Sequence, residues 1–186
     1  MRIIGGSLKG RSIDFLKNSN TRPLKDSVKE SIFNVLIHSN LIQTKIEKSK
    51  VLDLYSGIGS FGIEAISRGA ERITFVEKDI NAIDILNNNL IKLSITNKSK
   101  VLNSRIENFL NKEINEKFDI FFLDPPFADF NFLDNLKTIK KKKIFSDKYI
   151  IIIHREGKTE DELKSFFEII EIKQYGRSKI IFGVFK

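Results

Sequence analysis

The residues with the clearest chemical potential are Asp124-Pro125-Pro126-Phe127, which directly follow the hydrophobic stretch Phe118–Leu123. A parallel strand that ends this way presents its last side chains at the carboxyl edge of a sheet, where α/β proteins bind ligands. The prolines stiffen the backbone, so the Asp124 carboxylate and the Pro125 carbonyl become two acceptors at fixed positions. Together they can accept the N–H bonds of an exocyclic amine and stabilise the charge that develops on its nitrogen, while Phe127 stacks on the extruded base. A rigid turn with a buried phenylalanine is the alternative.

A second group of residues predicts the partner of that amine. The stretch Val51–Leu54 is followed by a G-x-G-x-x-G turn, which brings backbone N–H groups close to a ligand and is formed by Gly57, Gly59 and Gly62. Asp53, four residues before the first glycine, would repel a pyrophosphate in this turn but suits the ammonium and sulfonium of S-adenosylmethionine. Glu77 can accept hydrogen bonds from two ribose hydroxyls. We therefore predict an S-adenosylmethionine site, with a ligand-free turn or a nucleotide-dependent oxidoreductase as alternatives.

Composition limits the remaining classes. The chain has 186 residues, 41% of them hydrophobic and 30% charged, which predicts one soluble domain. It has no cysteine and two histidines, His38 and His154, so we expect neither a metal site nor a covalent cysteine intermediate. No transmembrane-length run or signal sequence is present, so we expect a cytoplasmic protein. The net charge of +8 permits a polyanionic partner, although a lysine-rich codon bias would also produce it.

Hydrophobic runs alternate with amphipathic stretches along most of the chain and predict a doubly wound α/β fold. The expected strands are Val51–Leu54, Ile73–Glu77, Val101–Asn103, Phe118–Leu123 and Tyr149–Ile153, followed by an antiparallel pair, Phe167–Lys173 and Lys179–Phe185. The expected helices between and after them are Phe61–Arg68, Ile80–Leu93, Glu107–Lys112, Phe132–Lys137 and Glu160–Phe167. Asp79 is expected to cap the second of these helices, and we interpret His154 as a polar strand end outside the site.

The region before this alternation, residues 1–44, predicts a small extension to the catalytic core at 45–186. Short apolar pieces around glycines predict a β-hairpin over Arg2–Asp14. A helix follows Pro23, with Ser27-x-x-Glu30 as a capping box. The run Lys140–Lys143 is expected to be a solvated loop.

These motifs, taken in order, resemble the bacterial 16S rRNA guanine-N2 methyltransferase family, RsmD. The matching pieces cover nearly the whole chain and are Arg2-Ile-Ile-Gly-Gly6 with Lys9-Gly10-Arg11, Thr21-Arg22-Pro23 with Asp26-x-Val28-x-Glu30-x-x-Phe33-Asn34, the Val51–Arg68 stretch, Asp124-Pro-Pro-Phe127 and Tyr175-Gly176. The resemblance implies a class I methyltransferase, a Rossmann-like seven-stranded sheet with its last strand antiparallel. It implies methyl transfer from S-adenosylmethionine to N2 of one guanine in 16S rRNA, free or in an assembling 30S subunit, by a monomer without a metal.

The resemblance also assigns residues. Asp124, Pro125, Pro126 and Phe127 would hold the target base. The cofactor pocket would comprise Asp53, Tyr55, Gly57, Gly59, Glu77, Lys78, Ser104, Arg105 and Asp124, with Thr21, Arg22 and Pro23 near the methionine end. Arg105 departs from the acceptor expected after the third strand, so Ser104 or backbone would read the adenine. An RNA-binding face would include Arg2, Lys9, Arg11, Arg22, Tyr175 and Arg177.

Other substrates fit the same motif. The amine of DNA adenine N6 or cytosine N4 is compatible with Asp124-Pro125-Pro126-Phe127, and only the whole-chain resemblance argues against DNA. A protein glutamine amide is disfavoured, because enzymes acting on it usually carry asparagine in place of Asp124. A non-catalytic RNA-binding module is disfavoured by the intact motif.

Overall fold

The computed structural model describes residues 1–15, 24–126, 128–159 and 161–186. Its helices are α1 (Asp26–His38), α2 (Ser60–Ser67), α3 (Ile80–Lys92), α4 (Ile106–Asn111) and α5 (Phe132–Lys142), with a short 3-10 turn η1 at Thr96–Lys98. Its strands are β1 (Lys50–Leu54), β2 (Arg72–Glu77), β3 (Ser99–Asn103), β4 (Phe118–Leu123), β5 (Phe145–Glu156), β6 (Phe167–Tyr175) and β7 (Ser178–Phe185). Among these helices, none is long and apolar enough to cross a membrane.

The strands form one seven-stranded sheet in the order β3-β2-β1-β4-β5-β7-β6. Strands β1 to β5 pair in parallel, and β7 is antiparallel to both β5 and β6. The predicted class I methyltransferase sheet, with its last strand antiparallel, is therefore confirmed. The strand order reverses at β1 and β4, so the glycine turn after β1 and the Asp-Pro-Pro segment after β4 meet at the same edge.

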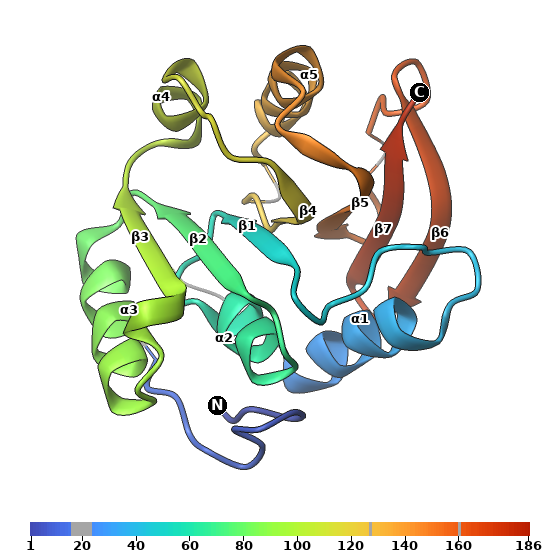
Figure 1. Cartoon of the computed structure of the whole chain (residues 1–186). Coiled ribbons are helices and arrows are strands. Elements are labelled where there is room, and N and C mark those ends of the chain that lie inside the picture. Colours follow the sequence, from blue (N-terminus) through green and yellow to red (C-terminus); the bar gives the residue numbers. More distant parts are fainter. Residues whose placement is uncertain (16–23, 127, 160) are drawn as a thin grey trace.

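Helices cover the two faces of the sheet (Figure 1). Side chains alternate between faces along each strand. Val51, Phe122 and Ile152 therefore belong to the cluster that packs with α1, α2 and α3. Leu52, Phe121 and Ile151 lie on the other face and belong to the cluster that packs with α4 and α5. Both faces are apolar, which explains why the strands read as nearly continuous hydrophobic runs.

The N-terminal segment forms a small antiparallel hairpin that packs along α2. The N–H of Ile3 donates to the carbonyl of Arg11 at 2.9 Å, the N–H of Ile13 donates to the carbonyl of Met1 at 3.0 Å, and Arg2 and Ser12 form the antiparallel bridge between these bonds. The buried carboxylate of Glu64 on α2 accepts from the backbone N–H groups of Ile4 and Gly5, both at 2.8 Å. The hairpin prediction is therefore confirmed, and α2 holds the hairpin against the core.

Three expectations were wrong. The N-cap of α1 is Lys25, without a side-chain cap, so Ser27 and Glu30 lie inside the helix and form no capping box. Residues 161–166 are coil and turn rather than helix, and Phe167 already belongs to β6. The lysine run is not a loop, since Lys140–Lys142 form the last turn of α5 and Lys143 is its C-cap. Cations in the last turn of a helix stabilise it by interacting with the negative end of the helix dipole.

Candidate active site

The turn after β1 places backbone groups at the mouth of a cavity. Gly57 and Gly59 have φ angles of 53° and 80°, in the left-handed region that glycine tolerates. A Cβ on Gly59 would lie 2.4 Å from Leu86 Cδ1, whereas one on Gly57 would meet nothing within 4 Å. Gly59 is therefore required by packing and conformation, and Gly57 leaves open space on the cavity side. Gly62 serves a third purpose, because its bare Cα lets Phe75 pack against α2.

Asp53 lies at the floor of this cavity and is 1% exposed. Its Oδ2 accepts from the N–H of Gly62 at 3.0 Å, while its Oδ1 is buried without a hydrogen-bond partner among the described residues. Burial raises the pKa of the Asp53 carboxyl well above its usual value, and the Gly62 hydrogen bond only partly opposes this shift. The carboxylates of Asp124 and Glu77 raise the pKa further. A cationic group of a ligand would pair with this buried carboxylate and offset the cost of its burial.

Glu77 ends β2 and closes the other side of the turn. Its Oε2 accepts from the N–H of Gly57 at 2.8 Å, and its Oε1 accepts from the N–H groups of Lys78 and Asp79. Each carboxylate oxygen can accept about two hydrogen bonds, so Oε2, which accepts one here, retains capacity toward the cavity. Asp79 caps α3 through Asn81 N–H at 2.9 Å, which confirms the prediction for that residue.

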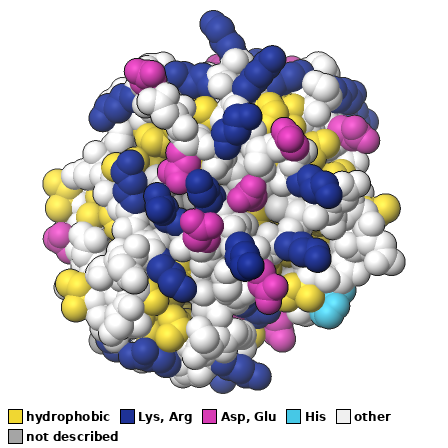
Figure 2. All heavy atoms as spheres, in the orientation of Figure 1, with side chains coloured by type: hydrophobic (Ala, Val, Ile, Leu, Met, Phe, Trp, Pro, Cys, Tyr) yellow, Lys and Arg dark blue, Asp and Glu magenta, His cyan; other side chains and the backbone are white. Residues whose placement is uncertain are grey.

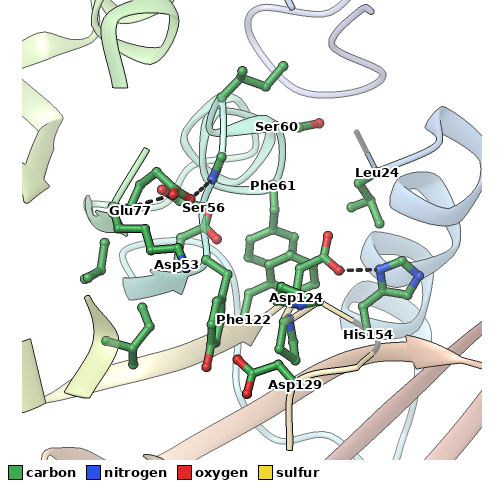
Figure 3. Close-up of a pocket in the computed structure, with 18 of the residues that line it drawn as sticks. Leu24, Asp53, Ser56, Ser60, Phe61, Glu77, Phe122, Asp124, Asp129 and His154 are labelled. Carbon is green, nitrogen blue, oxygen red and sulfur yellow. Dashed lines mark hydrogen bonds and ion pairs between the residues drawn. The ribbon is translucent and has the colours of Figure 1, made fainter. Parts of the chain in front are cut away.

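Asp124 enters the same cavity from the end of β4 (Figure 3). Its Oδ1 lies 2.8 Å from Nδ1 of His154, and the two side chains are 23% and 10% exposed. The interpretation of His154 as a residue outside the site was wrong, because it lines the cavity. The parallel pairing of Leu123 with Ile153 explains the contact, since it sets the next residues of β4 and β5 side by side.

Stacked aromatic rings form the apolar wall. The rings of Phe61 and Phe122 lie 4.1 Å apart with an interplanar angle of 14°, and Phe33 stacks on Phe61 at 5.1 Å. Phe61 and Phe122 line the cavity, and Figure 3 shows them between Asp53 and Asp124. Alternation within β4 could have revealed Phe122, since it lies two residues before Asp124 on the same face.

The opposite rim of the cavity comes from the loop after β3 and the first turn of α4. Ser104 and Arg105 of the loop and Glu107 of α4 line the cavity there. The Ser104 hydroxyl donates to the carbonyl of Arg105 at 2.9 Å, and the Ser104 N–H donates to the carbonyl of Glu77. Glu107 had no role in the sequence analysis, although its position one turn beyond the strand was visible there.

Tyr55 crosses from β1 toward α5. Its hydroxyl accepts from Asn135 Nδ2 at 3.0 Å, which holds the ring against the cavity wall. Its φ of 62° is unusual for a residue other than glycine. Burial raises the pKa of the Tyr55 hydroxyl, so it stays protonated at neutral pH.

The cavity measures about 440 Å³, a size suited to a nucleoside-sized ligand. Its described lining includes five carboxylic acids, Asp53, Glu77, Glu107, Asp124 and Asp129, and three basic residues, Lys78, Arg105 and His154. This acidic lining in a protein of net charge +8 fits a ligand with cationic groups better than one with a pyrophosphate. The orphaned Oδ1 of Asp53 supports the same fit.

Most predicted site residues meet in this cavity. It brings together Asp53, Tyr55, Gly57, Glu77, Lys78, Ser104, Arg105, Asp124, Pro125 and Pro126, whereas Gly59 supports the turn without lining it. Thr21, Arg22, Pro23 and Phe127 lie outside the described residues. The sequence analysis also missed Phe15, Leu24, Ser56, Ile58, Ser60, Val76, Ile106, Asp129 and Asn131, among the lining residues.

The predicted RNA-binding residues do not form one patch. Arg11 donates to the carbonyl of Lys92 at the carboxyl end of α3. Because α3 runs back from the carboxyl edge of the sheet, Arg11 lies near the amino edge. Tyr175 at the end of β6 and Arg177 in the β6–β7 turn are exposed, and the Arg177 carbonyl accepts from Gly157 N–H beyond the carboxyl end of β5. On the face in Figure 2, basic side chains are widespread and interspersed with acidic ones.

Fold and site together define a class I methyltransferase, with a ligand cavity at the switch point of a seven-stranded sheet. Solved structures agree. An Escherichia coli chain named as a methyltransferase, yhhF, superposes with a TM-score of 0.82 at 27% identity, covering 98% of this chain and 96% of that one. The Haemophilus influenzae methylase HI0767, so named, superposes with a TM-score of 0.77 at 28% identity, over 98% and 96% of the two chains.

The particular family follows from sequence. Residues 1–184 match the family model described as Conserved hypothetical protein 95, and the chain belongs to this family, that of RsmD-like methyltransferases. The ribosomal RNA small subunit methyltransferase D of Escherichia coli K12 is 31% identical over 84% of this chain and 75% of its own length. Its counterpart in Buchnera aphidicola subsp. Baizongia pistaciae is 36% identical over 84% and 76%.

Proposed function

We propose that this protein transfers a methyl group from S-adenosylmethionine to the exocyclic N2 amine of a guanine in 16S rRNA. One observation carries the proposal, namely that the buried, half-satisfied Asp53 and the Asp124-Pro125-Pro126 segment line the same cavity. The first favours a cationic methyl donor, and the second provides acceptors for an amine. The family supports the RNA substrate, since relatives carry the name ribosomal RNA small subunit methyltransferase D.

The donor half of the site would be formed by β1 and β2. Asp53 would hold the cationic end of the ligand, and the remaining acceptor site on Oε2 of Glu77 would bind a ribose hydroxyl. When bound, S-adenosylmethionine supplies an electrophilic methyl group on a sulfonium. Phe61 and Phe122 would exclude water from the space beside it, which strengthens the electrostatic interactions within the cavity.

The acceptor half is the segment after β4. The Asp124 carboxylate and the Pro125 carbonyl would accept the two N–H bonds of the amine and expose its lone pair. Because His154 occupies Oδ1 of Asp124, we assign the amine contact to Oδ2. As the N–C bond forms, the bond between the methyl carbon and the sulfonium sulfur would break and the neutral thioether would leave. Positive charge would grow on the nitrogen, and the Asp124 carboxylate would stabilise it and take up the released proton. In this proposal Phe127 stacks on the base.

The test is methyl transfer to rRNA from cells that lack this protein. With tritiated S-adenosylmethionine, we expect label in 16S rRNA, and mass spectrometry of the digested nucleosides should identify it as N2-methylguanosine. Label in DNA as N6-methyladenine or N4-methylcytosine would replace the RNA proposal with the DNA alternative. Calorimetric binding of NADH but not of S-adenosylmethionine would overturn the methyltransferase assignment.

A further inference from the structure

Two residues near the end of β5 contact the Asp124–Pro126 segment, here called the catalytic segment, from opposite faces of the sheet. His154 and Arg155 are consecutive, so their side chains point to opposite faces. His154 continues the face of Ile150 and Ile152, toward α1 to α3, and Arg155 that of Ile151 and Ile153, toward α5. The end of β5 therefore contacts the Asp124–Pro126 segment on two sides. His154 contacts it on the cavity face of the sheet, and Arg155 contacts it on the face that packs with α5.

The contact from behind is made by a fully buried arginine. Arg155 is 0% exposed, and its Nη1 donates to the carbonyl of Pro126 at 3.2 Å. Its Nε and Nη2 donate to the two carboxylate oxygens of Asp161, both at 3.2 Å, and the guanidinium lies 4.5 Å from the centroid of the Phe132 ring. Bidentate pairing and stacking fix the plane of the guanidinium, so the Nη1 donor has a defined direction.

The Pro126 carbonyl is also the acceptor for the N–H of Asp129, at 2.8 Å. Arg155 therefore braces the turn that carries the chain from the Asp-Pro-Pro segment to the cavity residues Asp129 and Asn131. Burying an arginine is costly unless it is paired, and an ordinary apolar side chain would fill the same volume without that cost. The buried Arg155–Asp161 pair is therefore consistent with a role in positioning the Pro126 carbonyl.

We propose that His154 and Arg155 are positioning residues that together hold the catalytic segment, His154 through the Asp124 carboxylate and Arg155 through the Pro126 carbonyl. This inference rests on the proposed function, because it assigns to Asp124 the contact with the amine. An imidazole donor at Nδ1 fixes the rotation of the carboxylate, so that its second oxygen faces the substrate. A carboxylate displaced by about 1 Å can lose about a hundredfold in rate.

The cavity side is tested by two substitutions at His154. In His154→Asn the amide nitrogen can take the place of Nδ1 and donate to Asp124, whereas His154→Leu offers no donor. We expect kcat to fall about ten- to hundredfold in His154→Leu and to stay within about threefold of the wild type in His154→Asn, with the same affinity for S-adenosylmethionine by calorimetry in both. Wild-type kcat in His154→Leu, or equal losses in both variants, would overturn the positioning role.

The other side is tested by a double variant that is expected to fold. Arg155→Met with Asp161→Leu replaces the buried pair by apolar residues of similar size, which proteins often tolerate, and removes the donor to Pro126. We expect a cooperative unfolding transition, a tenfold or larger loss of kcat and an unchanged Kd for S-adenosylmethionine. Hydrogen exchange should accelerate at the Asp129 amide, whose acceptor loses its brace. Unchanged exchange and kcat would overturn the inference.

Tyr149→Phe is the matched control. Tyr149 lies on the same strand, away from the cavity, and its hydroxyl accepts from the N–H of Phe185 at 2.8 Å. The substitution removes one polar contact of β5 and should change neither kcat nor exchange at Asp129. If the wild type methylates no rRNA, the proposed function fails, whereas the exchange measurement still decides whether Arg155 braces the segment.

Discussion

Replacing Asp53 by asparagine should make the protein more stable and a worse binder of S-adenosylmethionine. In the folded chain the carboxyl is 1% exposed, and Oδ1 has no partner among the described residues. Asparagine has the same shape and keeps an acceptor for the Gly62 N–H, but it carries no charge into the interior. The two effects have opposite signs, so a general loss of fold cannot produce both.

The size of each effect follows from the contacts. A buried polar group without its partner costs about 1–3 kcal/mol, and more when it is charged. For a chain of this length each kcal/mol shifts Tm by about 2–4 °C, so Asp53→Asn should raise Tm by about 2–12 °C at neutral pH. A hydrogen bond to a charged group contributes about 1.5–3 kcal/mol, so the Kd for S-adenosylmethionine should rise about ten- to hundredfold.

The stability gain has a defined pH dependence. Because the pKa of Asp53 is raised in the folded state, the unfolded chain loses this proton first as the pH rises. Wild-type stability therefore falls, relative to the variant, from a pH near 3.8, the usual pKa of an aspartate, up to the folded pKa of Asp53, and the difference is constant above it. Below 3.8 both states of the wild type are protonated and the difference should vanish.

The assay is denaturant unfolding of both proteins across this pH range, with calorimetric titration of S-adenosylmethionine. Binding to the wild type should tighten with rising pH, because a cationic ligand favours the carboxylate, and binding to Asp53→Asn should lose this dependence. Asp84→Asn, an exposed change of the same charge on α3, should leave stability within about 0.5 kcal/mol. A variant less stable than the wild type at neutral pH, or a difference independent of pH, would refute the reasoning.

Three other substitutions separate catalysis from folding. Asp124→Ala should abolish methyl transfer to rRNA while most of the affinity for S-adenosylmethionine remains, and a normal rate of tritium transfer would contradict the proposed mechanism. Gly59→Ala should destabilise the chain by about 1–3 kcal/mol in urea unfolding, because its φ is 80° and the new Cβ would lie 2.4 Å from Leu86; unchanged unfolding would show that the turn relaxes. Lys29→Met removes the ion pair of Lys29 with the buried Glu64 at 3.7 Å but leaves the pair of Glu64 with Arg68 at 2.8 Å, so it should cost about 1.5–3 kcal/mol, and unchanged stability would mean that Arg68 alone compensates Glu64.

Sequence and structure agree most closely where a pattern reflects local chemistry. Strand periods, the glycine turn and the Asp-Pro-Pro motif predicted a parallel sheet with a cavity at its carboxyl edge, because buried strands must be apolar on both faces. The N-cap of α3 was predicted for the same reason, since Asp79 bonds within its own turn. The capping box and the expected helix at 160–167 failed because packing, not local propensity, determines where those elements begin.

Tertiary structure determined which residues contact the Asp-Pro-Pro motif. The amino-acid sequence by itself determined the class of fold, the acids Asp53 and Glu77 beside the glycine turn and the acceptors after β4. Only the pairing of β4 with β5 brought His154 within 2.8 Å of Asp124, and only the packing of α5 buried Arg155 behind Pro126. Strand register acts between segments some thirty residues apart, so no local pattern in the chain encodes it.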